Sequence, residues 1–169
     1  TVFVTELLHK IQGFKKVYLN KLGFPSLMSS FDKALFNTFR CYVSKDFYPK
    51  KFVKFEDDRG CFVEIARTDT TGQTSYSSTV PGVTRGNHYH TRKAERFAVI
   101  KGKARIQVRK IGTNEVVEYF LNGNEPAFVD MPIWHTHNIT NIGSEELLTI
   151  FWINEPYNEL DPDTYFENV

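Results

Sequence analysis

Residues 82–102 read GVTRGNHYHTRKAERFAVIKG, with two histidines and a glutamate in close succession. On an extended strand, residues two apart share a face, so His88 and His90 point the same way. The four residues between His90 and Glu95 let the chain turn and bring a carboxylate to the same centre. His137, on a distant strand, would complete the set. Imidazole nitrogens with one carboxylate suit zinc, iron, manganese or nickel far better than magnesium or calcium, so the pattern predicts a transition-metal site.

From about residue 52 the chain consists of short runs bounded by Asp, Asn, Gly and Pro, which predict strands. Residues 103–109 alternate apolar and polar side chains, as a half-buried strand does. Glycine-containing segments at 101–103 and 111–114 predict hairpin turns. Many short strands without intervening helices predict a sandwich or barrel. The predicted strands span 52–55, 61–67, 74–80, 96–101, 103–111, 116–121, 127–129, 136–140 and 146–153.

The first fifty residues have a different pattern. Apolar side chains recur at helical spacing over 7–14, where Thr5 is a candidate cap, and again over 31–39, after Ser29 and Ser30. Gly-Phe-Pro at 23–25 separates the two predicted helices. Two short helices are too few to fold alone, so we expect them to dock on the rest of the chain or on a missing domain.

Composition narrows the class of protein. At 169 residues the chain is about one domain long, and its 15 Phe, 8 Tyr and 2 Trp favour a β-rich enzyme. A net charge of +1 gives no electrostatic case for nucleic acid, and no apolar run approaches the roughly 20 residues that span a bilayer. Cys41 and Cys61 form no CxxC pair and suit a reducing cytosol, so we expect a cytoplasmic protein. The start at Thr1 suggests a piece of a longer protein.

Two motifs carry a resemblance to the cupin superfamily. The pattern G-x5-H-x-H-x4-E-x6-G at 82–102 resembles the first cupin signature at every defined position. The pattern P-x-W-x-x-H-x-x-x-N at 132–141 resembles the second, with Trp134 where that signature usually has glycine. The resemblance implies a mainly β, double-stranded β-helix (jelly-roll barrel) with a short N-terminal helical segment. It makes His88, His90, Glu95 and His137 the metal ligands and places His135 in a turn, with a structural or surface role.

Flanking motifs resemble nucleotide-sugar 3,5-epimerases of the dTDP-4-keto-deoxyglucose type. DDRGCFVE at 57–64 resembles their DxRGxFxE opening, and RGNHY at 85–89 resembles their RGxHY segment. In that family the arginine of RGxHY meets the nucleotide diphosphate and the histidine is the base. The resemblance therefore implies that Arg59, Glu64 and Arg85 bind the substrate.

The whole chain is similar to the C-terminal part of bifunctional capsular polysaccharide synthesis enzymes acting on UDP-2-acetamido-2,6-dideoxy-4-hexuloses. That family joins a short-chain reductase domain to a metal-binding cupin. The resemblance implies C3 epimerisation in the cupin and NADPH-dependent C4 reduction in the partner domain. Because a GxxGxxG turn is absent from the sequence, we expect the reductase half to be missing. Residues 1–50 would then be a remnant of the domain boundary, and 51–169 the barrel.

A 4-keto group acidifies the proton on C3, and its removal gives an enolate that needs stabilisation. Zinc or another divalent transition metal, or Arg85, Lys101 or Lys103, could stabilise the enolate, and Tyr76, Tyr89 or Tyr157 could return the proton. A coordinated nitrogen cannot accept a proton, so His88 is either ligand or base, and we favour ligand. If His88 is free, the other three ligands and water still form a site. The candidate catalytic residues are His88, Tyr89, Lys103 and Tyr157.

Two other functions remain open at this point. An iron-dependent cupin dioxygenase or isomerase would use the same ligands. A non-catalytic module would use a structural metal to stiffen a dimer or to bind a sugar. We also predict a homodimer, because Phe31, Phe36 and Phe39 add apolar surface that one barrel would not cover.

Overall fold

A computed structural model describes residues 2–68 and 72–169. In this part of the chain four helical segments precede the strands: α1 (Val4–Phe14), the π-helix η1 (Lys15–Asn20), α2 (Ser30–Cys41) and the 3-10 helix η2 (Lys45–Phe47). The strands are β1 (Lys54–Asp57), β2 (Gly60–Thr68), β3 (Gly72–Thr79), β4 (Thr84–Tyr89), β5 (Glu95–Lys101), β6 (Lys103–Lys110), β7 (Val116–Asn122), β8 (Ala127–Met131), β9 (His135–Asn141), β10 (Leu147–Ile153) and β11 (Tyr165–Phe166). Each of the nine predicted strands has a counterpart here, whereas β4 and β11 were not predicted as strands.

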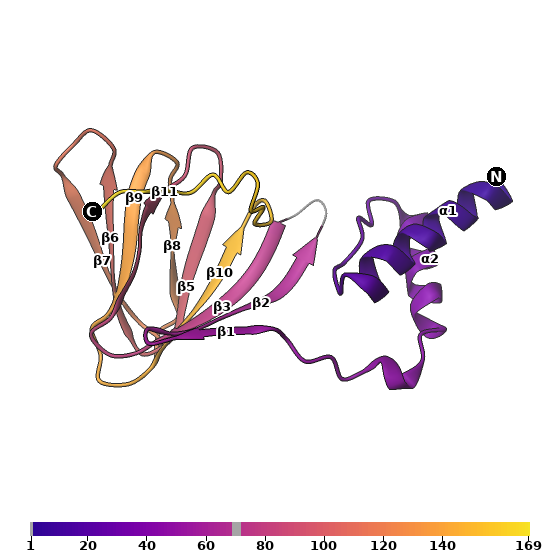
Figure 1. The fold of residues 1–169 in the computed structure, drawn as a ribbon, viewed down its shortest axis with the longest axis horizontal. Coiled ribbons are helices and arrows are strands. Elements are labelled where there is room, and N and C mark those ends of the chain that lie inside the picture. The colour runs from indigo at the N-terminus through magenta and orange to yellow at the C-terminus, as the bar shows by residue number, and fades with distance from the viewer. Residues whose placement is uncertain (1, 69–71) are drawn as a thin grey trace.

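The strands form two antiparallel sheets that face each other as a jelly-roll barrel (Figure 1). One sheet has the order β1-β2-β3-β10-β5-β8, and the other has the order β11-β4-β9-β6-β7. Consecutive strands often lie in different sheets, so the chain winds back and forth between the two layers. The predicted mainly β barrel with a short N-terminal helical segment is confirmed.

The barrel core lies between the two sheets, where inward side chains alternate with exposed ones. On β6, Ala104 and Ile106 are fully buried while Arg105 between them is partly exposed, which confirms the predicted alternation. Burial of this apolar surface is the main stabilising contribution to the barrel. The buried core comprises Phe97, Val99, Ala104, Ile106, Val108, Leu121, Met131, Ile139 and Leu147.

The two predicted hairpin turns have different outcomes. Strands β6 and β7 pair directly across residues 111–115, so that hairpin is confirmed. The prediction at 101–103 was wrong, because β5 pairs with β8 and β10 while β6 pairs with β7 and β9. Gly102 therefore carries the chain from one sheet to the other. Its φ is +84°, and an added Cβ would lie 3.0 Å from the Cα of Leu147, so glycine is required.

The helical segment lies beside the barrel and joins it through β1 (Figure 1). Ser29, which precedes the second predicted helix, caps α2 by accepting a hydrogen bond from the backbone N–H of Asp32. The predicted cap at Thr5 was wrong: α1 begins at Val4, Phe3 precedes it, and no side chain caps that end. No helix in the described ranges is long and apolar enough to cross a membrane.

An aromatic cluster of its own holds the helical segment together. Phe14, Tyr18 and Phe36 are buried in it and meet edge to face, with Tyr18 and Phe36 ring centroids 5.3 Å apart. The segment touches the barrel where the N–H of Phe24 donates to the carbonyl of Arg67 on β2 at 3.0 Å. The segment between η1 and α2 thus contacts the barrel at β2.

Candidate metal centre and cavity

A bulge in β4 directs His88 towards the barrel interior. The pairing of β4 with β9 runs regularly to Gly86, which lies opposite Asn138, and then shifts so that His88 lies opposite His137. Gly86 and Asn87 both have positive φ, and a Cβ on Gly86 would lie 2.8 Å from the carbonyl oxygen of His137. A bulge of this kind changes the direction of a side chain. Here it places His88 beside His137, on the same face of the sheet.

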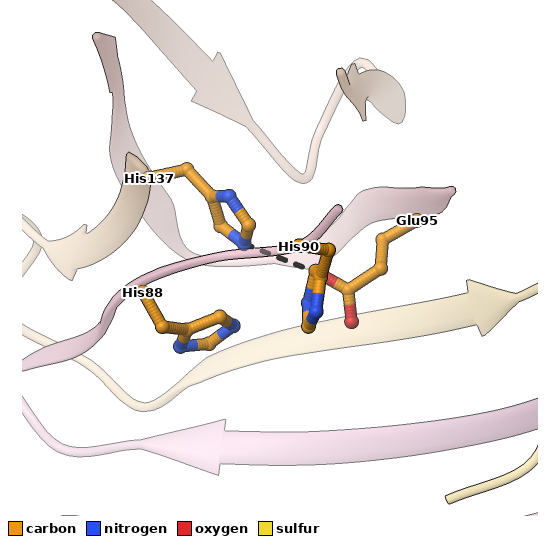
Figure 2. A group of neighbouring side chains, drawn as sticks. All are labelled: His88, His90, Glu95 and His137. Atoms are coloured by element: carbon orange, nitrogen blue, oxygen red, sulfur yellow. Dashed lines mark ion pairs between the residues drawn. The ribbon is translucent and has the colours of Figure 1, made fainter. Parts of the chain in front are cut away.

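Figure 2 shows His88, His90, Glu95 and His137 converging from β4, the turn after it, β5 and β9. One potential ligand atom from each of the four lies within 4.8 Å of the others. Glu95 Oε2 is 3.1 Å from His90 Nε2 and 3.2 Å from His137 Nε2. The His88 ring centroid lies 4.7 Å from that of His137. The four residues predicted to share one centre are therefore brought together.

The other ring nitrogens of two histidines are held by backbone carbonyls. His90 Nδ1 contacts the carbonyl of Asp163, and His137 Nδ1 lies 3.2 Å from the carbonyl of His135. A proton on each Nδ1 leaves each Nε2 lone pair facing Glu95, as in many metal sites. Among the described residues, His90 Nε2, Glu95 Oε2 and His137 Nε2 are buried side-chain atoms without a hydrogen-bond partner. A cation between them would satisfy all three, so the residues fit a metal ion.

The pKa shifts within the cluster also favour a bound positive charge. Burial, followed by the charge of His137, lowers the pKa of His88 to about 4, so His88 is neutral at pH 7. Burial lowers the pKa of His90, but contact with Glu95 outweighs it and the pKa is raised. Burial alone would raise the pKa of Glu95, yet His137 and His90 bring it below its usual range. The carboxylate stays ionised and attracts positive charge, either a proton on a histidine or a metal ion.

The donor set indicates which ions would bind. Three imidazole nitrogens and one carboxylate suit zinc and neighbouring transition metals, with an open position for water or substrate in several of them. His135 lies outside the cluster, with its Nδ1 2.9 Å from the carbonyl of Ile133.

A cavity of about 640 Å³ opens beside the cluster, within the size range of small-molecule sites. Its walls carry His88, His90 and Glu95 together with the three predicted substrate-binding residues: Arg59, Glu64 and Arg85. These residues come from separate strands and turns, and the barrel brings them to a single space.

Arg85 presents unsatisfied donors to this cavity. Its Nε and Nη2 are buried and have no hydrogen-bond partner among the described residues, although Nη2 is 3.6 Å from Asp57. Burial lowers the pKa of Arg85, opposed by the charge of Asp57. Arg59 is bound more closely to Asp57, at 2.5 Å, and remains half exposed at the edge of the cavity. A guanidinium buried with free N–H groups is suited to an anionic ligand.

The other predicted catalytic residues divide into two groups. Tyr157 lines the cavity, whereas Tyr76, Lys101 and Lys103 are not among its lining residues. Tyr89 is not among them either, because it alternates with His88 on β4 and stacks outside on Trp134 and Tyr165. The geometry therefore does not bring Tyr89 or Lys103 to the centre.

Several cavity residues were not predicted. Gln73, Ser75 and Ser77 occupy alternate positions on β3, and all three are buried against the cavity. Because residues two apart on a strand share a face, the spacing of these three polar residues was the signal that would have identified them. Arg67 also lines the cavity and is paired with Glu64 at 2.8 Å.

Lys93 is a further unpredicted residue of the wall. Only 2% of it is exposed, and its Nζ donates to the carbonyl of Pro162 at 2.5 Å. A buried lysine is rare in proteins, but its position between His90 and Glu95 in the sequence gave no sign of burial.

Known proteins with related sequences and folds agree with this architecture. UDP-2-acetamido-2,6-beta-L-arabino-hexul-4-ose reductase of Pseudomonas aeruginosa is 40% identical over 138 residues, covering 81% of this chain and 37% of that protein. The capsular polysaccharide assembling protein CapF of Staphylococcus aureus is 36% identical and superposes with a TM-score of 0.89, over 99% of this chain and 49% of CapF. This chain thus spans less than half the length of either relative.

Oxalate decarboxylase of Lactobacillus farciminis, a cupin, is 21% identical and has a TM-score of 0.54, over 62% of this chain and 31% of that one. This likeness concerns the fold alone and confirms the predicted cupin barrel. Residues 55–165 match the family described as the polysaccharide biosynthesis C-terminal domain. Because this match covers well over half of the sequence, the chain belongs to the polysaccharide biosynthesis C-terminal domain family.

Proposed function

We propose that this barrel epimerises C3 of a UDP-2-acetamido-2,6-dideoxy-4-hexulose through an enolate, in the synthesis of a capsular polysaccharide precursor. The observation that carries the proposal is the cavity where the unsatisfied donors of Arg85 and the four-residue cluster meet. One end suits a diphosphate and the other suits a polarised carbonyl. The name of the Pseudomonas relative, a reductase of a UDP-hexul-4-ose, supports the same substrate class.

Substrate binding is assigned to the arginines of the cavity. Arg85 donates its free Nε–H and Nη2–H groups to the diphosphate, and Arg59 adds charge at the edge. Glu64 accepts two hydrogen bonds from Arg67, of 3.0 and 2.8 Å, which hold its carboxylate in a fixed position in the cavity wall. The contacts of the arginines with the diphosphate exist in ground and transition states alike, so they orient the sugar without themselves lowering the chemical barrier.

The chemistry occurs at the cluster end of the cavity. A zinc or similar ion held by His88, His90, Glu95 and His137 would act as a Lewis acid that polarises the 4-keto group. The proton removed from C3 needs a base, and with His88 held as a ligand we assign this role to Glu64, the carboxylate of the cavity wall outside the cluster. We assign the proton returned to the opposite face of C3 to the hydroxyl of Tyr157, since it alone of the three candidate tyrosines lines the cavity.

His88 is assigned as a ligand rather than as the base. Its candidate ligand atom lies within 4.8 Å of those of His90, Glu95 and His137, so small side-chain shifts would let all four surround one ion. The lowered pKa of about 4 keeps His88 neutral and able to coordinate. Replacement by asparagine separates the two roles: loss of metal and activity together fits a ligand, and loss of activity with metal retained fits a base.

The greater length of the relatives supports a second domain in the full-length protein. We propose that a reductase domain in the same full-length protein completes the pathway by NADPH-dependent reduction at C4, and that residues 1–50 form the boundary with it. A homodimer and a cytoplasmic location also remain part of the proposal. The long relatives support a second domain, because this chain covers only 37% of the Pseudomonas reductase.

The stereochemistry of the product tests the proposal. The purified chain, loaded with zinc and given the 4-keto UDP-sugar without NADPH, should form the C3 epimer, seen by proton NMR as a changed coupling at C3. Unchanged sugar, or oxygen consumption by an iron-loaded sample, would contradict the epimerase assignment, and the latter would favour the dioxygenase alternative. Binding without turnover would favour the non-catalytic module.

A further inference from the structure

The C-terminal segment, residues 161–168, crosses one end of the barrel (Figure 1, yellow). Its strand β11 pairs with β4 and places Phe166 opposite His88. The hydroxyl of Thr136, the neighbour of His137 on β9, donates to a backbone carbonyl of the same segment. The segment therefore contacts two of the strands that carry cluster histidines.

Within this segment, the carboxylate of Asp163 is buried and accepts four hydrogen bonds. Oδ1 accepts from the N–H of Thr91 at 3.1 Å and from its hydroxyl at 2.6 Å. Oδ2 accepts from the N–H groups of Arg92 and Lys93, both at 3.0 Å. Burial would raise the pKa of Asp163, but these donors lower it to about 2. The carboxylate thus fixes the turn that connects His90 to the strand of Glu95.

The backbone of Asp163 also holds the imidazole ring of His90, one of the four residues of the cluster. The carbonyl of Asp163 accepts from His90 Nδ1, which leaves Nε2 directed at Glu95. Asp163 has a φ of +43°, a left-handed conformation that non-glycine residues adopt at a cost. The four hydrogen bonds to the carboxylate hold the residue in that conformation, with its carbonyl on the histidine.

We propose that Asp163 is a positioning residue for the metal centre, fixing the 91–93 turn through its carboxylate and the orientation of His90 through its carbonyl. This inference rests on the metal centre proposed above. Partners that orient a ligating histidine in this way typically contribute 10- to 100-fold in metal affinity. Asp161, two residues earlier, offers a matched comparison: its carboxylate is exposed and pairs with Arg92 at the surface, at 2.7 Å.

The test compares Asp163→Ala with Asp161→Ala in the full chain. Zinc affinity is measured by competition with a chromophoric chelator, and Co²⁺ absorption reports ligand geometry in the same samples. We expect Asp163→Ala to bind zinc about 10- to 100-fold more weakly, with an altered Co²⁺ spectrum. Asp161→Ala should keep the parent affinity within about threefold, because it touches only a surface ion pair.

A purely structural role for Asp163 would lower the melting temperature of the metal-free chain and leave zinc affinity and the Co²⁺ spectrum unchanged, which would overturn the inference. If Asp163→Ala does not fold, Thr91→Val removes only the 2.6 Å hydroxyl donor and should still weaken zinc binding by about threefold or more. Unchanged affinity in a folded Thr91→Val would then overturn it. A parent chain that binds no metal would remove the centre itself, and the inference with it.

Discussion

Replacement of Glu95 by glutamine removes the only carboxylate of the four-residue cluster without changing its shape. Glu95 Oε2 lies 3.1 Å from His90 Nε2 and 3.2 Å from His137 Nε2. An amide is a poor ligand for zinc, so metal binding should be lost. In the metal-free chain the carboxylate is held by its contact with His90 and His137, and the neutral amide of glutamine can replace part of this contact by donating to a histidine nitrogen. The two metal-free chains should therefore differ much less in stability than the two chains in zinc.

The size of the effect follows from mass action. A free zinc concentration of 100 times the dissociation constant stabilises the folded parent by about 2.7 kcal/mol. In a chain of 169 residues this raises the melting temperature by roughly 5–11 °C. Glu95→Gln should show a rise close to zero. The difference in melting temperature between parent and variant should thus be small in chelator and large in zinc, where the parent is the more stable.

The assay is thermal unfolding followed by circular dichroism, in chelator and in zinc. Glu155→Gln is the control, because Glu155 is a partly exposed carboxylate that pairs with Arg92 at 2.8 Å, away from the cluster. The control should gain as much from zinc as the parent does. An equal gain in Glu95→Gln would remove Glu95 from the site, and a variant destabilised equally in both conditions would show that it acts by packing alone.

Three further outcomes are expected. Arg85→Ala should raise KM for the UDP-sugar by about 10- to 100-fold with little change in kcat, because a charged contact to the diphosphate is made equally in ground and transition states; a fall in kcat alone would place Arg85 elsewhere. The pKa of His88 lies below its unfolded value of 6.5, so the unfolded chain takes up this proton first as pH falls: His88 should contribute a loss of roughly 2 kcal/mol of stability to the metal-free chain between pH 7 and pH 5, and His88→Asn should remove this contribution. Light scattering at micromolar concentration should return a dimer, and a mass of 19.6 kDa would contradict that prediction.

The sequence predicted the strands well because alternation and turn residues are local signals. Strand β6, for example, was expected over 103–111 and spans Lys103–Lys110. The sheet to which each strand belongs is not a local property. A glycine between two runs predicts a turn, but only the distant partners of β5 and β6 decide that Gly102 joins two sheets instead of closing a hairpin.

In the candidate site, too, local sequence signals predicted some features, whereas features set by tertiary contacts were missed. Spacing within 88–95 and one distant histidine were enough to predict which four residues meet, because the motif encodes their faces and the turn between them. The orientation of Tyr89 was missed because the bulge at Asn87 and the stacking on Trp134 are set by tertiary contacts. Asp163 was not predicted, because its part in the site depends on a segment that returns to β4 from the end of the chain.

The most direct test of the proposed chemistry is exchange of the C3 proton of the 4-keto UDP-sugar with deuterium from solvent, without NADPH. The zinc-loaded chain should incorporate deuterium at C3, and both the chelator-treated chain and Glu95→Gln should lose this exchange. An absence of exchange in a folded, zinc-loaded sample that binds the sugar would contradict the epimerase account. Full exchange in the chelator-treated sample would contradict the part that assigns the chemistry to the metal centre.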